Sequence, residues 1–246
     1  EEMKENDDFS PYAGRRSIME AQADLVQARW ESNLDQYDRT EMNSQQPNFS
    51  CRVELPSYFY IPNELYYSFG GQLGKQINTQ GGMDALNEAL YQLPTSEQVY
   101  SPEKYFSGEQ YEAVEIENLQ VDGYELIKEG TVGALDLPYI LQDTIGRGAS
   151  VQAAIGIGGG SWKDYVNSSQ QLMMSVKMTG DSPTELNEIY SAYSLWANAQ
   201  TRFTSQQPFA GGTLYIGDTN IWISTDSKYV RIILTQELGI FNEIES

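Results

Sequence analysis

The spacing of apolar residues changes along this chain, and the change decides which folds are open to it. Over residues 15–37 apolar side chains recur every three or four positions without Gly or Pro, the spacing of an amphipathic helix. The C-terminal part instead holds three short runs rich in β-branched and aromatic residues, at 213–216, 220–223 and 229–234, separated by turns. An α+β fold is therefore expected, mainly helical first and closed by a small antiparallel β meander.

The 246 residues are enough for one large domain or two small ones. We expect an acidic tail over residues 1–12, a helical region over residues 13–205 and the β meander, packed on that region, over residues 206–246.

Several local signals refine this expectation. Helices should begin at Thr95, at Ser101-Pro102 and at Ser182-Pro183, because each pairs a capping side chain or an N-terminal proline with a helical pattern. By similar reasoning we expect a long irregular connection over residues 38–62, a half-exposed strand over residues 113–117 and a glycine hinge or close-packed turn at residues 158–160.

The chain contains no histidine and one cysteine, Cys51. The lack of histidine excludes Ser-His-Asp and Cys-His nucleophiles and every His-ligated zinc or iron site within these residues. A single cysteine excludes an internal disulfide and a Cys-based metal site. Any chemistry must therefore rest on carboxylates, hydroxyls, Lys and Arg.

The charge balance is strongly acidic, with 15 Lys and Arg against 35 Asp and Glu and a formal net charge of −20. Such a surface repels nucleic acid and anionic lipid, so neither is an expected partner. No apolar run approaches the roughly 20 residues that span a bilayer, so no transmembrane segment is expected. The excess of carboxylates is typical of a halophilic protein or an exposed cell-surface protein, which predicts an extracellular or cell-surface location.

The middle of the chain carries a motif that resembles a known family. Residues 94–109 read P-T-S-E-Q-V-Y-S-P-E-K-Y-F-S-G-E. This run is similar to P-x-S-T-E-Q-[IV]-[LI]-H-P-E-K-Y-x-x-G-E of secreted or lipoprotein zinc-metallopeptidase-like proteins of bacteria and haloarchaea. Flanking pieces keep the family's order: residues 13–30 resemble its E-G-D-A helix, 80–87 its G-G-W-x-x-V-N, 143–147 its D-x-L-G-E and 158–165 its G-W-G-G-D-R-Y. The resemblance spans roughly residues 13–203.

The departures from the family fall on its polar site positions. Its H-E-x-x-H zinc motif, in which two His share one helix face with a Glu base, would precede residue 1 or be missing. Ser101 stands where the family has His, Arg147 where it has Glu, and Gln22 where it has Asp, while Glu20 keeps its carboxylate. The resemblance thus implies a retained scaffold and a degenerate metal site.

The resulting hypothesis is a non-catalytic pseudo-peptidase that acts as an extracellular binding or structural module, without a cofactor and with a protein or peptide as partner. One alternative is the C-terminal part of an active secreted zinc metallopeptidase, with H-E-x-x-H upstream and Glu20 as a third zinc ligand. Another is a cell-surface or filament subunit that self-associates through edge strands of the meander.

Two further features concern the surface. Tyr58, Phe59 and Tyr60 form the best candidate for an exposed aromatic binding surface. Asn48 and Asn167 each begin an N-x-[ST] pattern and are candidate glycosylation sites if the protein is exported.

Overall fold

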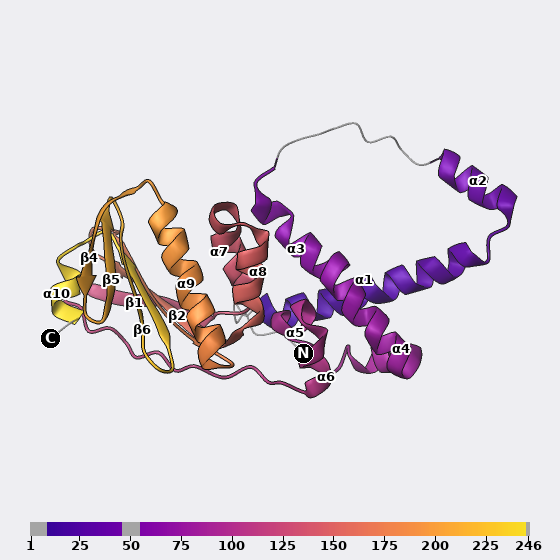
Figure 1. Ribbon diagram of the computed structural model, residues 1–246, viewed down its shortest axis with the longest axis horizontal. Helices are drawn as coiled ribbons and strands as arrows, with labels where there is room; N and C mark the ends of the chain where they lie inside the picture. The colour runs from indigo at the N-terminus through magenta and orange to yellow at the C-terminus, as the bar shows by residue number, and fades with distance from the viewer. Residues whose placement is uncertain (1–8, 46–54, 245–246) are drawn as a thin grey trace. The chain divides into compact units, whose positions relative to one another are not determined.

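The computed structural model describes residues 9–45 and 55–244 (Figure 1). The chain divides into an N-terminal unit, Pro11–Phe106, and a C-terminal unit that begins at Ser107. Helices make up the first unit and a seven-stranded antiparallel sheet dominates the second, so the α+β expectation is confirmed. None of the described helices combines the length and the apolar character that a membrane crossing requires.

In its described residues, 11–45 and 55–106, the N-terminal unit contains helices and no strand. Its elements are α1 (Phe9–Ser32), α2 (Gln36–Ser44), the 3-10 turn η1 (Ser57–Phe59), α3 (Ile61–Asn63), the π-helical turn η2 (Glu64–Phe69), α4 (Gly70–Glu88), α5 (Ser96–Tyr100) and α6 (Pro102–Ser107). The helix start expected at Thr95 is confirmed: its side chain accepts a hydrogen bond from the backbone N–H of Gln98, which completes a capping box.

Small residues let α1 and α4 approach closely. A Cβ atom at Gly70 would lie 2.8 Å from the Cβ of buried Ser17, and one at Gly74 would lie 2.3 Å from the Cβ of buried Ala21. Neither glycine could carry a side chain without moving the partner helix. Leu73 and Ile77, on the same side of α4, are buried with Ile18 of α1 in the core of this unit.

Two expectations for this unit are wrong in their boundaries. The acidic tail was expected to reach residue 12, but α1 begins at Phe9. Residues 38–62 were expected to be irregular, but α2 covers Gln36–Ser44 because the Asp35 side chain caps it by accepting a hydrogen bond from the Asp38 backbone N–H at 2.9 Å.

The C-terminal unit is a sheet with helices. Its elements are β1 (Tyr124–Thr131), α7 (Asp136–Ile145), α8 (Arg147–Ile155), β2 (Ile157–Asn167), β3 (Leu172–Gly180), α9 (Pro183–Ala199), β4 (Phe203–Phe209), β5 (Gly212–Gly217), β6 (Asn220–Thr225), β7 (Val230–Thr235) and α10 (Ile240–Ile244). The strand order is β1-β2-β3-β7-β6-β5-β4, and every neighbouring pair is antiparallel.

The expected meander is present as β5, β6 and β7, but it does not stand alone. Strand β7 pairs with β3 through residues such as Val176, opposite Ile232, so the C-terminal strands extend a sheet that begins at β1. The boundary expected at residue 205 therefore falls inside β4, and three strands lie within the region that was expected to be helical.

One face of this sheet is covered by α9, which contacts β2, β3, β6 and β7 and packs beside α7 and α8 (Figure 1). The helix begins as the sequence predicts, with the Ser182 side chain accepting a hydrogen bond from the Glu185 backbone N–H and proline in the first turn. It ends at Ala199.

The opposite face is crossed by an extended segment, residues 109–121, which we call the strap. Its backbone accepts hydrogen bonds from Ser161 in β2 and Lys177 in β3, and its Leu119 N–H donates to the Tyr165 hydroxyl at 3.1 Å. Its end, Val121, joins a core cluster on this face with Tyr165 and α10.

The strap corrects two sequence expectations. Residues 113–117 are not a strand, because their hydrogen bonds go to side chains of the sheet and not to a neighbouring backbone. Residues 158–160 are not a hinge or turn, because they lie within β2. Glycine is needed at position 159, where a Cβ atom would lie 1.9 Å from the carbonyl oxygen of Glu112 in the strap.

Candidate ligand-binding site

The helix-covered face of the C-terminal unit contains a cavity whose floor is two rows of side chains. Side chains of a strand alternate between faces, so residues paired across the sheet line up in rows. One row runs from Trp162 through Val176 to Ile232, and the next runs from Asp164 through Met174 to Leu234 and Ile221.

The helices supply the walls. Tyr193 and Trp196 of α9 and Asp136 and Ile140 of α7 face the floor, with Val132 beside them. The cavity volume is about 270 Å³, slightly below the roughly 300–1,000 Å³ of most small-molecule pockets. Ile140 is 46% exposed, so the cavity opens to solvent on the α7 side.

Asp164 brings a carboxylate to the apolar floor. Burial raises the pKa of the Asp164 carboxyl, and the ammonium group of Lys128, its neighbour on β1, offsets part of that rise. Lys128 itself is exposed, with its Nζ 5.8 Å from the centre of the Trp162 ring. The cavity therefore holds a partly buried carboxylate, whose burial Lys128 offsets only in part.

Asp136 is the second carboxylate of the lining. One of its oxygens accepts a hydrogen bond from the Gly133 backbone N–H at 2.7 Å, which fixes the start of α7. Burial, together with the negative charge of Asp136, raises the pKa of the Tyr193 hydroxyl, so Tyr193 is a neutral phenol at any physiological pH.

The lining as a whole suits binding better than covalent chemistry. Ten of the twelve described residues that line the cavity are aliphatic or aromatic, and the other two are Asp136 and Asp164; none of the twelve is Ser, Thr, Cys, Lys or Arg. An apolar pocket with a few placed polar groups is the usual form of a small-ligand site.

The degenerate zinc-site positions of the sequence analysis fall in both units. Glu20 and Gln22 lie on α1 and Ser101 follows α5, whereas Arg147 begins α8 in the C-terminal unit. The Glu20 carboxylate is 2.7 Å from Nε of Arg16, one helical turn away, and Gln22 donates a hydrogen bond to Asn87. A zinc ion at Glu20 would compete with the Arg16 guanidinium for this carboxylate.

The aromatic stretch is exposed as expected. Tyr58, Phe59 and Tyr60 are 48%, 49% and 49% exposed, and the Tyr58 and Phe59 rings lie 4.3 Å apart. Nothing in the described part of the chain identifies a ligand for them. Their role as a binding surface stays a prediction.

The two sequons differ. Asn48 lies outside the described residues. Asn167, at the end of β2, donates hydrogen bonds to Gln171 at 2.8 Å and to Glu237 at 2.7 Å. The same side chain accepts from the backbone N–H groups of Ser169 and Gln171. Its amide is therefore committed to the β2–β3 turn, which favours a structural role over glycan attachment.

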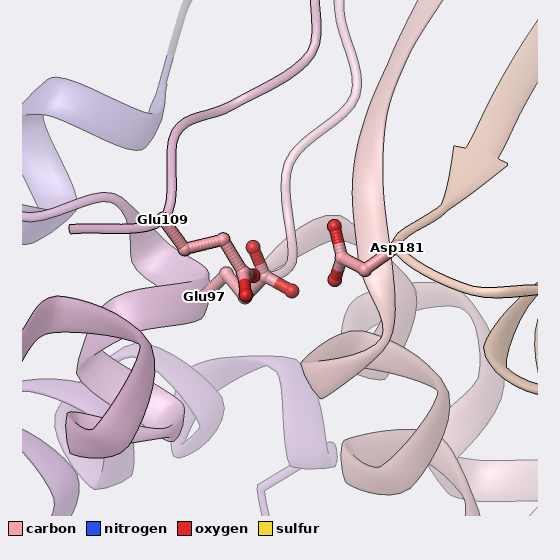
Figure 2. A group of neighbouring side chains, drawn as sticks. All are labelled: Glu97, Glu109 and Asp181. Carbon is pink, nitrogen blue, oxygen red and sulfur yellow. The ribbon is translucent and has the colours of Figure 1, made fainter. Parts of the chain in front are cut away.

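The C-terminal unit also holds a pair of acidic residues outside the cavity. Figure 2 shows Glu109, at the start of the strap, and Asp181, after β3; a carboxylate oxygen of each lies within 4.8 Å of the other. Glu97, also labelled there, belongs to the N-terminal unit, where its carboxylate lies 2.7 Å from Nζ of Lys104. Calcium takes about six to eight oxygen ligands, of which these two carboxylates could supply at most about four.

Sequence reasoning missed Asp136 and Asp164 as members of one site. The available signal was the alternation Trp162–Asp164 in β2, which places an acid on the same face as an aromatic ring. Reading it correctly required the knowledge that residues 157–167 form a strand. Comparisons with protein-family models, with curated proteins and with solved structures found no match to this chain.

Proposed function

We propose that the protein is a non-catalytic binding module that holds a small ligand in the cavity between the sheet and helices α7 and α9. The proposal rests on the composition of the cavity lining, whose described residues are ten aliphatic or aromatic residues and two aspartates. The resemblance to secreted zinc peptidases, without their histidines, supports the non-catalytic part of this proposal and an extracellular or cell-surface location.

A carboxylate pair in one pocket also suits glycoside hydrolysis, with one acid protonated and one ionised. Sugars, however, bind through many hydrogen bonds to their hydroxyl groups. The residues around Asp136 and Asp164 are aliphatic or aromatic, with the Tyr193 hydroxyl and the indole N–H groups as the other polar atoms of their side chains. The lining therefore favours an apolar ligand over a glycan.

Self-association through the exposed edge strand β4 has weaker support. Most of β4 is exposed, but Pro208 lacks an N–H and the register of β4 against β5 is irregular between Phe203 and Ser205. Both features are typical of edges that resist the addition of another strand.

Two measurements test the proposal. Small apolar ligands should bind the purified protein and stabilise its C-terminal unit, and zinc at equimolar concentration should leave its melting temperature unchanged. The variant Glu20→Gln, which removes the retained zinc-ligand candidate, should behave like the parent protein in zinc. Tightly held stoichiometric zinc with peptidase activity, lost in Glu20→Gln, would overturn the proposal in favour of the zinc-peptidase alternative.

A further inference from the structure

The cavity carries an electrostatic preference among possible ligands. Among the described residues that line it, the acidic groups are the carboxylates of Asp136 and Asp164, and none is Lys or Arg. The whole chain has a formal charge of −20, which adds to the negative potential at the cavity. An anionic ligand would be repelled. A ligand without a hydrogen-bond donor would bury Asp164 further without providing a partner, which costs free energy, and a neutral donor would leave its negative charge uncompensated.

The aromatic residues of the cavity also favour a cationic ligand. Trp162, Tyr193 and Trp196 contribute three rings to one cavity, and aromatic faces attract cations. Two of these rings already hold a cationic side chain: Lys128 lies 5.8 Å from the Trp162 ring centre, and Arg202 lies 5.3 Å from that of Trp196. Both cations belong to exposed residues, outside the cavity lining.

We propose that the ligand of this cavity is a small organic ammonium ion with an apolar body. The apolar body lies on the floor formed by Val176, Met174 and Leu234, and the ammonium group donates hydrogen bonds to the Asp164 carboxylate among the aromatic rings. This inference rests on the proposed binding function and names the chemical class of its ligand.

The experiment compares three probes of similar size and different charge: 2-phenylethylammonium, 2-phenylethanol and 3-phenylpropionate. Binding is followed by calorimetry and by the fluorescence of the tryptophans, two of which, Trp162 and Trp196, line the cavity. We expect the ammonium probe to bind about tenfold or more tightly than the alcohol, and the carboxylate probe to bind weakest.

The variant Asp164→Asn removes the charge with little change in shape. It should reduce the affinity for the ammonium probe about tenfold or more and should not reduce the affinity for 2-phenylethanol. Asp218→Asn, in the exposed β5–β6 turn and outside the cavity lining, makes the same change in net charge and should leave both affinities unchanged. Asp164 is preferred to Asp136 as the test position because the Asp136 carboxylate also accepts a hydrogen bond from the Gly133 backbone N–H.

A third variant locates the binding. Ile140→Trp, at the open side of the cavity, should block all probes while the far-ultraviolet circular dichroism stays that of the parent protein. Equal affinity for ammonium and alcohol, or an unchanged ammonium affinity in Asp164→Asn, would overturn the assignment of ligand class and leave a cavity-binding function standing. Failure of every probe to bind the folded parent protein would overturn both.

Discussion

A Cβ atom placed on Gly74 of α4 would lie 2.3 Å from the Cβ atom of Ala21 of α1, so the two helices meet with no room for a side chain between them. Together with the contact between Gly70 and Ser17, it explains why α4 contains glycine at positions 70 and 74, which an isolated helix would fill with alanine. These two glycines allow α1 and α4 to pack closely, at a cost in helix propensity.

Replacing Gly74 with Ala should therefore lower the free energy of unfolding of the N-terminal unit by about 1–3 kcal/mol, because the methyl group forces the helices apart. Gly71→Ala is the matched control on the same helix, since its Cβ would meet only an Asp24 oxygen at 4.0 Å. It should stabilise by up to about 1 kcal/mol through helix propensity. Urea unfolding of both variants measures the difference, and equal effects would contradict the proposed helix contact.

Asp164 should reduce stability at neutral pH. Burial raises the pKa of its carboxyl in the folded state above that in the unfolded state. The contribution of this group to the free energy of unfolding therefore falls as the pH rises from the unfolded-state pKa through the folded-state pKa. Asp164→Asn should raise the melting temperature at pH 7 by about 1–3 °C. At pH 3, where the carboxyl is protonated in both states, the two melting temperatures should coincide. A lower melting temperature of Asp164→Asn at pH 7 would show that the ionised carboxylate is stabilised by Lys128.

Asp226 makes the opposite contribution in the β6–β7 turn. Although burial raises its pKa, hydrogen bonds from the Lys228 and Tyr229 backbone N–H groups and the Arg231 guanidinium outweigh burial and hold the pKa at about 2. A depressed carboxyl pKa stabilises the fold above its unfolded value, about 3.9, and that stability is lost as pH falls toward 2. Asp226→Ala should thus be less stable than the parent at pH 7, with the gap closing between about pH 4 and pH 2. Melting curves across this range check it. The stability of Asp226→Asn at pH 7 should lie between that of the parent protein and that of Asp226→Ala, because asparagine keeps a side-chain acceptor for the turn.

Lys177 should fix the strap to the sheet. Its Nζ donates to the Glu115 carbonyl at 2.9 Å, lies 3.3 Å from the Glu117 carboxylate, and is 4.5 Å from the centre of the Tyr229 ring. Lys177→Met keeps most of the side-chain volume and removes these polar contacts, at a cost of about 1.5–3 kcal/mol. Backbone amides of residues 109–121 should exchange hydrogen faster in Lys177→Met than in the parent protein. In the control Lys75→Met, which changes an exposed lysine, their exchange should stay as in the parent protein. Unchanged exchange in the strap would contradict this role.

Asn167 should stay unglycosylated when the protein is produced in a glycosylating host, because its amide nitrogen already donates to Gln171 and Glu237. Asn167→Ala should destabilise the C-terminal unit by about 1–3 kcal/mol through the unpaired groups it leaves. Intact-mass measurement and thermal unfolding test the two statements. A glycan on Asn167 of the folded protein would show that the β2–β3 turn opens.

The elements that the sequence predicts well are those with a local cause. Ser182 caps α9 and Thr95 caps α5 through side chains three residues from their partners. The strands β5, β6 and β7 follow from short apolar runs between turns. These signals act within a few residues, so an amino-acid sequence displays them directly.

The errors have non-local causes. Residues 113–117 alternate like a strand but contact side chains of Ser161 and Lys177, more than 40 residues away. Residues 158–160 have the composition of a turn, but the strap's approach at Glu112 requires glycine inside β2. In both cases the same residues suit two local conformations, and distant partners select one of them.

The sequence by itself determined the α+β class, the helix caps, the final strands, the acidic charge and the exclusion of histidine chemistry, because each depends on composition or on neighbours a few positions apart. Only the tertiary structure decided that β7 pairs with β3 and that Asp136, Asp164, Tyr193 and Trp196 line one cavity. Those contacts join segments tens of residues apart. Whether they form depends on the free energy of packing the whole unit and not on any local preference.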